Sequence, residues 1–87
     1  MAELRLPRTL TPLFPDIPTR LEVDATSVWE AVEQLDSRWP GLRDRLCEPG
    51  PVLRPHIHVY VDRDRARLDT PLETHSSVIV VAAISGG

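Results

Sequence analysis

The stretch that decides the fold is residues 78–87, which read Val-Ile-Val-Val-Ala-Ala-Ile-Ser-Gly-Gly. Residues 78–83 are apolar at every position, and a strand that is apolar on both faces usually lies centrally in its sheet. Two residues later the run passes into Gly86-Gly87. A chain end normally frays and carries no chemistry. A strand that leads directly into two glycines therefore predicts a tail with a function.

The size of the chain bounds what it can do. Its 87 residues carry a net charge of −3. We expect a single domain over residues 1–87, with a flexible tail at residues 84–87. A domain this small has room for one core and no deep catalytic cleft, which favours a carrier, a subunit or a binding module over an enzyme. The acidic net charge argues against nucleic acid, for which a basic patch is expected.

The residue types indicate a compartment. Cys47 is the only cysteine, so no internal disulfide is possible and a reducing compartment fits. The first residues lack a secretory signal pattern, and the longest apolar run, residues 78–84, is too short to span a membrane. We therefore expect a cytoplasmic protein with no membrane partner. All ten basic residues are arginine, so the chain cannot be linked to itself through a lysine.

Two strands and one helix are predicted in the first half. Residues 3–6 and 20–24 alternate between apolar and charged side chains, which indicates a hairpin with a long, proline-bearing loop. Ser27 and Glu30 have the spacing of a capping box. An apolar face with helical spacing follows, formed by Val28, Ala31, Val32, Leu35 and Trp39. Pro40-Gly41 then ends the helix, and residues 42–47 add one short turn.

The second half predicts three more strands. Residues 56–62 alternate strictly, residues 65–68 form a short strand, and residues 78–83 form the last one. We expect residues 48–51 to be a loop without regular structure. This order describes an α+β domain, in which one helix covers one face of the sheet. The other face stays open, and apolar side chains of the last strand on it are candidates for partner binding.

Five stretches carry a family resemblance. Residues 39–46 read Trp-Pro-Gly-Leu-Arg-Asp-Arg-Leu; the others are residues 6–10, 58–62, 69–72 and 78–87. In this order they resemble the MoaD/ThiS family of sulfur carriers, and more distantly ubiquitin. The chain is most similar to the actinobacterial CysO-like carriers that feed cysteine biosynthesis. The resemblance implies a ubiquitin-like β-grasp fold: a mixed four- to five-stranded sheet with one main helix packed on one face.

The resemblance also implies a chemistry for the tail. A MoeB/ThiF-like activating enzyme would use ATP to adenylate the carboxylate of Gly87. A persulfide sulfur donor would convert the adenylate to a thiocarboxylate, and an acceptor enzyme would take the sulfur. The chain itself would be a monomeric carrier without bound cofactor. Gly86 and Gly87 suit this role because glycine has no Cβ, so a nucleophile can approach and the tail can thread a narrow channel.

The resemblance further implies a docking surface. Ile79 and Val81 would point to the open face of the sheet, with His58 and Tyr60 as a polar rim. The inner positions of the same strand, Val78, Val80 and Ala82, would face the helix. The partner-binding surface would continue along the tail through Ala83, Ile84 and Ser85.

Three features depart from the family pattern or offer other sites. Ala82 and Ala83 replace prolines, which leaves the acceptor enzyme open. His75 replaces a family glycine, so we expect it to be a strained turn residue with positive φ. His56 and His58 have a chelating spacing but no third ligand, so we expect surface histidines and no metal. We interpret Cys47 as semi-buried rather than catalytic, and Trp29 and Trp39 as packing residues.

Several functions stay open at this stage. The sulfur could go to cysteine, molybdopterin, thiazole or a secondary metabolite. The chain could instead be the small subunit of molybdopterin synthase, with its tail in the large subunit. It could be a ubiquitin-like modifier joined to lysines of other proteins through Gly87. It could also be an interaction domain in which the two glycines are incidental.

Overall fold

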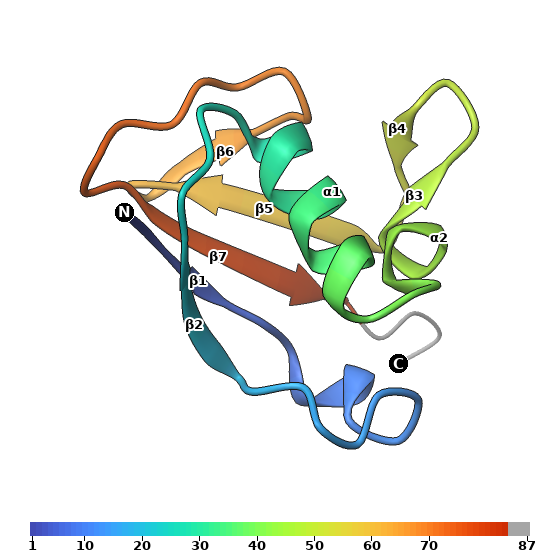
Figure 1. The fold of residues 1–87 in the computed structure, drawn as a ribbon. Coiled ribbons are helices and arrows are strands. Elements are labelled where there is room, and N and C mark those ends of the chain that lie inside the picture. Colours follow the sequence, from blue (N-terminus) through green and yellow to red (C-terminus); the bar gives the residue numbers. More distant parts are fainter. Residues whose placement is uncertain (84–87) are drawn as a thin grey trace.

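A five-stranded sheet with one long helix lying across it forms the body of the protein (Figure 1). The computed structural model describes residues 1–83. The strand order is β2-β1-β7-β5-β6. The strands of this sheet are β1 (Ala2–Arg5), β2 (Arg20–Val23), β5 (Ile57–Val61), β6 (Asp64–Ala66) and β7 (Ser77–Ala82).

Strand β7 occupies the middle of this sheet. It pairs in parallel with β1 and antiparallel with β5, while β1–β2 and β5–β6 are hairpins. The sheet is therefore mixed, as expected, and the prediction of a central last strand is confirmed. The predicted fold class, a mixed sheet with one main helix on one face, is confirmed as well.

Helix α1 (Val28–Arg38) begins at the predicted serine cap. The Ser27 Oγ accepts a hydrogen bond from the Glu30 N–H at 3.1 Å, and the Glu30 carboxylate accepts one from the Thr26 N–H at 3.0 Å. These bonds satisfy backbone donors that the first turn leaves free. After the helix, Gly41 adopts φ 98°, a left-handed conformation that favours glycine, and α2 (Leu42–Leu46) follows.

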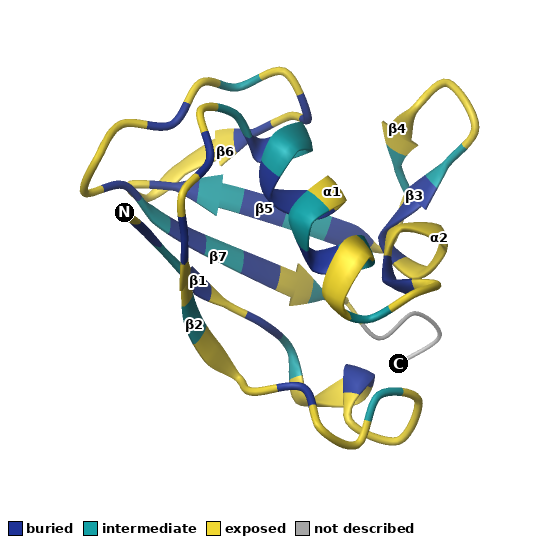
Figure 2. Ribbon diagram, viewed as in Figure 1, coloured by how far each residue is buried: buried dark blue, intermediate teal, exposed yellow. Residues whose placement is uncertain are grey.

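The core lies between α1 and the sheet face that it covers (Figure 2). Each fully buried aliphatic side chain contributes about 1.5–3 kcal/mol of transfer free energy. The predicted apolar face of α1 is buried except for Trp39, which packs partly buried against the core. The largest fully buried side chains are Leu4, Val28, Leu35, Leu42, Leu46, Val59 and Val78.

One small hairpin was not predicted. Strands β3 (Cys47–Glu48) and β4 (Val52–Leu53) pair antiparallel, so the expectation that residues 48–51 hold no regular structure is wrong at Glu48. The prolines and Gly50 occupy only the turn, which leaves the flanking residues free to pair. The long first loop also contains a short 3-10 helix, η1 (Arg8–Leu10).

The strained turn lies elsewhere than predicted. Positive φ among non-glycine residues occurs at Asp62 (50°) and Arg63 (78°), and His75 is not one of them. Val61 and Asp64 are cross-strand partners, so Asp62 and Arg63 form the two-residue loop between β5 and β6. Such loops need positive φ at both positions to match the twist of the strands. The prediction for His75 is therefore wrong.

The boundaries of the short fourth strand also differ. We predicted residues 65–68, whereas β6 ends at Ala66. The Arg67 N–H donates to the Thr70 Oγ at 2.9 Å, which takes the chain out of the ladder. No helix within residues 1–83 has the length and apolar character that a membrane crossing requires.

Candidate docking face

The face of the sheet that α1 leaves uncovered carries four of the predicted site residues. Cross-strand pairing sets Ile79 of β7 opposite Tyr60 of β5, and Val81 opposite His58. Ile79, Tyr60 and His58 are half-buried, and Val81 is 39% exposed. We call Ile79 and Val81, together with their rim residues Tyr60 and His58, the apolar centre of the open face. Because they come from two paired central strands, the sheet holds them at fixed spacing.

The alternate residues of β7 face the helix. Val78 and Val80 are buried in the core, and Ala82 packs partly buried against it. The orientation of the strand therefore agrees with the expectation for all five positions. That Ile79 and Val81 bind a partner stays a prediction.

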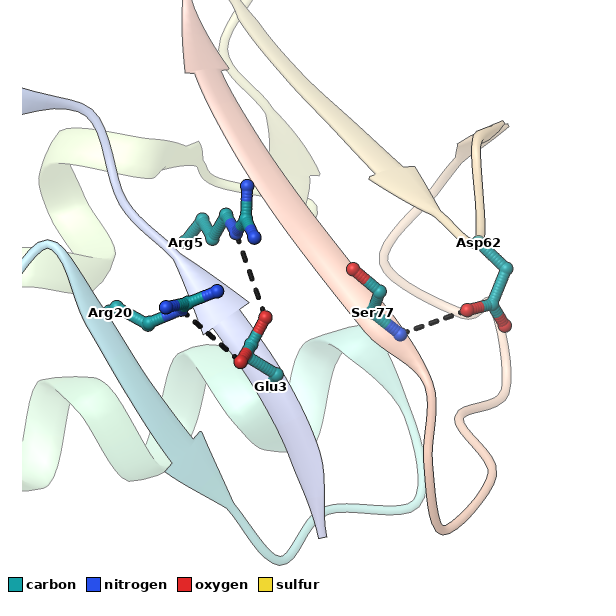
Figure 3. A network of polar contacts seen from close by, with 5 residues as sticks. All are labelled: Glu3, Arg5, Arg20, Asp62 and Ser77. Atoms are coloured by element: carbon teal, nitrogen blue, oxygen red, sulfur yellow. Dashed lines mark hydrogen bonds and ion pairs between the residues drawn. The ribbon is translucent and has the colours of Figure 1, made fainter.

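Charged side chains of β1 and β2 flank the apolar centre on one side (Figure 3). Glu3 lies between two arginines: its carboxylate is 3.6 Å from the Arg5 Nε and 3.2 Å from the Arg20 Nε. The register places Arg5 beside Ile79 and opposite Arg20, in one row across the sheet. Two cations share one anion, so this group keeps surplus positive charge.

Arg65 of β6 flanks the centre on the other side. Its Nη2 lies 2.6 Å from the His58 Nδ1, and its guanidinium carbon lies 6.0 Å from the centre of the Tyr60 ring. Because a guanidinium can only donate, the His58 Nδ1 is the acceptor of this contact. Arg65 thereby orders both rim residues of the apolar centre.

The sequence did not indicate that the arginines of this face lie together beside the apolar centre. Their signal was present in the alternation of residues 3–6 and 20–24, which puts charges on the side away from the core. The alternation within a strand does not show which strands are neighbours in the sheet. Only the parallel pairing of β1 with β7 brings Arg5 next to Ile79.

The predicted tail begins at the end of β7. The Ala83 N–H donates to the His56 carbonyl at 2.8 Å, so the chain follows β5 for one residue beyond the strand. This bond places Ala83, the last described residue, beside β5 at the end of the sheet where β7 finishes. The other predicted site residues, Ile84, Ser85, Gly86 and Gly87, lie outside the described residues.

Comparison with solved structures gives close matches over the whole chain. A chain of the Amycolatopsis orientalis BexX/CysO complex matches with a TM-score of 0.87 at 21% identity, covering 100% of both chains. Mycobacterium tuberculosis CysO matches at 0.83 and 19%, covering 97% of this chain and 100% of that one. SAMP1 from Haloferax volcanii matches at 0.75 and 24%, covering 99% and 98%. No protein-family model and no curated protein sequence matches the chain.

The chain has the β-grasp fold of CysO and SAMP1. At these identities the likeness establishes the fold. The resemblance to the CysO-like carriers noted in the sequence therefore holds at the level of structure.

The other reactive or metal-binding side chains within residues 1–83 form no second candidate site. Burial raises the pKa of the Cys47 thiol, and the nearby Arg43 and Arg54 offset this only in part. A buried thiol with a raised pKa is a poor nucleophile. No three histidine, cysteine or acidic side chains within residues 1–83 cluster as metal ligands would.

The β-grasp body also has a hollow on the helix side. It measures about 710 Å³ and lies between the first turn of α1 and the β3–β4 hairpin. Trp29, Val52, Leu53 and Leu68 give it mainly apolar walls. The first helical N–H groups beside it are already bonded to the carbonyls of Leu68 and Thr70, so they offer no anion site.

Proposed function

We propose that this chain is a sulfur carrier whose working group is the carboxylate of Gly87. The observation that carries the proposal is the pairing of a CysO- and SAMP1-like fold with the Gly-Gly that follows its central strand. The fold alone would fit many binding modules, and two glycines alone could be incidental. A β-grasp body whose central strand is followed by two glycines is typical of a protein that presents its C-terminal carboxylate to other proteins.

The proposed chemistry runs through an activated acyl group. A carboxylate is a poor electrophile, so a partner enzyme transfers AMP from ATP to the Gly87 carboxylate and releases pyrophosphate. The terminal sulfur of a persulfide attacks the acyl carbon and AMP leaves, which forms an acyl disulfide. A thiol then attacks the other sulfur of that bond and releases the thiocarboxylate, with a disulfide as the second product. The thiocarboxylate sulfur then forms a bond to the substrate of the acceptor enzyme, and water cleaves the acyl–sulfur bond, which leaves the sulfur on that substrate and restores the Gly87 carboxylate.

The proposed part of the folded body is to hold the tail in place. Fixing a flexible residue in a partner's site costs about 1–2 kcal/mol of backbone entropy. Burial of an aliphatic side chain such as Ile79 or Val81 contributes about 1.5–3 kcal/mol. The two aliphatic side chains together would contribute about 3–6 kcal/mol, which offsets much of the cost of about 4–8 kcal/mol for ordering four tail residues.

Intact mass spectrometry of protein purified from its native host tests the proposal. We expect a fraction of the molecules to carry one sulfur in place of one oxygen, located on the last residue by fragmentation. Deletion of Gly87 should abolish this mass and the sulfur delivery that depends on it. Sulfur delivery that survives the deletion would refute the proposal.

A second candidate, a ubiquitin-like modifier, is favoured by the likeness to SAMP1, which is named as a small archaeal modifier protein. The same activated Gly87 would then form an isopeptide bond with lysines of other proteins. The last arginine is Arg67, so trypsin would leave residues 68–87 attached to such a lysine. Branched peptides carrying this remnant would support the modifier, and they would vanish on deletion of Gly87.

A further inference from the structure

We propose that a charge gradient along the open face fixes the direction in which this chain docks. The partner it fits is a protein surface with an apolar centre, carboxylates on the side where the tail leaves, and basic groups on the far side. This inference rests on the proposed function, in which the partner is the activating enzyme. It concerns residues that the sequence did not single out.

The gradient follows from the register of the sheet. Arg20, Arg5, Ile79, Tyr60 and Arg65 form one row across all five strands. Two residues away from the tail, a second row contains Glu22, Glu3 and Ser77. Two residues along a strand span about 7 Å. Along the direction in which β7 runs, the face therefore changes from acidic to basic between two rows that lie about 7 Å apart.

The basic row is only partly neutralised. Glu3 carries one negative charge and contacts both Arg5 and Arg20. Among residues 1–83, Arg65 takes part in no ion pair with a carboxylate, and its polar contact is the Nδ1 of His58. Arg5 and Arg20 on one flank and Arg65 on the other thus place three positive charges in this row, and the carboxylate that contacts two of them belongs to the acidic row; the whole chain has a net charge of −3.

The acidic row is exposed in turn. Glu22 lies on the edge strand β2 and is exposed, and it makes no ion pair within the described residues. Asp62 lies at the same end of the sheet, where its Oδ1 accepts the Ser77 N–H at 2.9 Å (Figure 3). Glu3, Glu22 and Asp62 at this end outnumber Arg63, which lies beside Asp62 in the same loop, so this end is the negative pole of the face.

A charge gradient can determine the docking orientation, because the apolar centre alone would fit an apolar patch about equally well in two opposite orientations. Only one of these orientations sends the tail into an active site. Like charges brought together at an interface cost several kcal/mol in general, so complementary poles select one orientation. Charged rims also steer the encounter, which makes the association rate depend on salt.

The test measures ATP–pyrophosphate exchange by the purified MoeB/ThiF-like activating enzyme of the host, with this chain as the substrate. The double variant Arg20→Glu/Arg65→Glu reverses the basic row without touching the core. We expect kcat/KM to fall about tenfold or more at low salt, with the difference shrinking at high salt. We expect kcat to change little, because the charges act on docking.

The matched control is Arg43→Glu/Arg45→Glu on α2, which packs beside α1 on the covered side (Figure 1). It alters the net charge by the same amount, and its kcat/KM should stay near that of the wild type. An equal loss in both double variants would assign the effect to net charge and overturn the proposal.

Glu22→Arg separates a gradient from a plain basic patch. If the partner has basic groups opposite Glu22, this variant should lower kcat/KM as well. A faster reaction would mean that any added positive charge helps, which overturns the gradient. A dimer that sediments as such and dissociates in Arg20→Glu/Arg65→Glu would also overturn it, because the face would then belong to a second copy.

Deletion of Gly87 keeps the two proposals apart. Exchange that is lost on this deletion but unaffected by the charge reversals would refute the docking inference alone. Wild-type protein that supports no exchange with the activating enzyme would refute the proposed function, and the inference with it.

Discussion

The two faces of β7 are formed by alternate residues of one strand, and they differ in what covers them. Val78 and Val80 point into the core and are 1% and 6% exposed, whereas Val81 is 39% exposed on the other side. All are valines, so the chemistry of the side chain does not distinguish them. The distinction comes from what lies opposite: α1 covers one face, and nothing within residues 1–83 covers the other. Apolar residues on the inner face hold the fold, and those on the outer face remain available to a partner.

The comparison extends to polar groups. On the covered side, the polar contacts belong to helix caps and turns, as at Ser27 and Asp36, whose Oδ1 accepts the N–H groups of Gly41 and Arg43. On the open side, Glu3, Arg5, Arg20 and Arg65 contact one another or the rim of the apolar centre. Such exposed ion pairs contribute little to stability. The proposed docking assigns them a role in recognition instead.

The largest expected effect separates the two faces by stability. Val78→Asp puts a charge among buried aliphatic side chains with no partner, and we expect a loss of about 4 kcal/mol in the free energy of unfolding. A small domain has about 5–15 kcal/mol in total, so this variant should be largely unfolded on moderate warming. Urea denaturation followed by circular dichroism measures the change.

Ile79→Asp is the matched control for that variant, one residue further along the strand. Its side chain lies on the open face, so the new carboxylate keeps its water and stability should change far less. Similar losses in both variants would mean that the open face is covered in solution, and the comparison between the faces would break.

The next effect separates the faces by activation. Val81→Asp should leave the free energy of unfolding within about 0.5 kcal/mol of the wild type. Loss of one buried aliphatic contact of about 1.5–3 kcal/mol corresponds to a fall of about 10- to 100-fold in kcat/KM for adenylation. Val52→Asp is the control, because Val52 is 53% exposed on β4, far from the open face. Unchanged activation of Val81→Asp would remove Val81 from the docking surface.

The sequence predicted the inner face better than the outer one. Strand β7, the amphipathic α1 and the cap at Ser27 each carry a strong local signal, and the structure contains all three. Burial in α1 follows from its periodicity, because its apolar side chains gather on one side. Strand β7 is apolar at every position, so its sequence indicated a central strand but not which residues face the helix. The outer face depends on strand order, which periodicity does not contain, and so the row from Arg20 to Arg65 was missed.

Two errors have local causes. Strands of two residues, such as β3 and β4, are too short for any alternation to be read from them. The prediction of positive φ at His75 rests on analogy with a family glycine. A two-residue hairpin loop requires positive φ at its own two positions, which are Asp62 and Arg63. The diglycine was evident in the sequence from the start, and its role stays a prediction.

A smaller effect tests whether the helix supports the covered face alone. Ser27→Ala removes the acceptor of the Glu30 N–H, and we expect a loss of about 1 kcal/mol in the free energy of unfolding. Well below the unfolding transition, kcat/KM for adenylation should be unchanged, because the open face is intact. Ser37→Ala, at an exposed position inside α1, is the control and should not destabilise. Impaired activation of Ser27→Ala under these conditions would show that the two faces are coupled.

The smallest effect is a pH dependence that belongs to the covered side. Burial raises the pKa of Cys47 above its ordinary value, so between the unfolded and the folded pKa the unfolded chain binds fewer protons than the native one. The contribution of Cys47 to stability is therefore complete below about pH 8.5 and is lost as the pH rises through the folded pKa. Urea midpoints of the wild type and of Cys47→Ala, compared across this range, isolate the effect because all other titrating groups are shared. The wild type should lose stability faster with rising pH; parallel curves would mean that the Cys47 thiol is as accessible as a group on the open face.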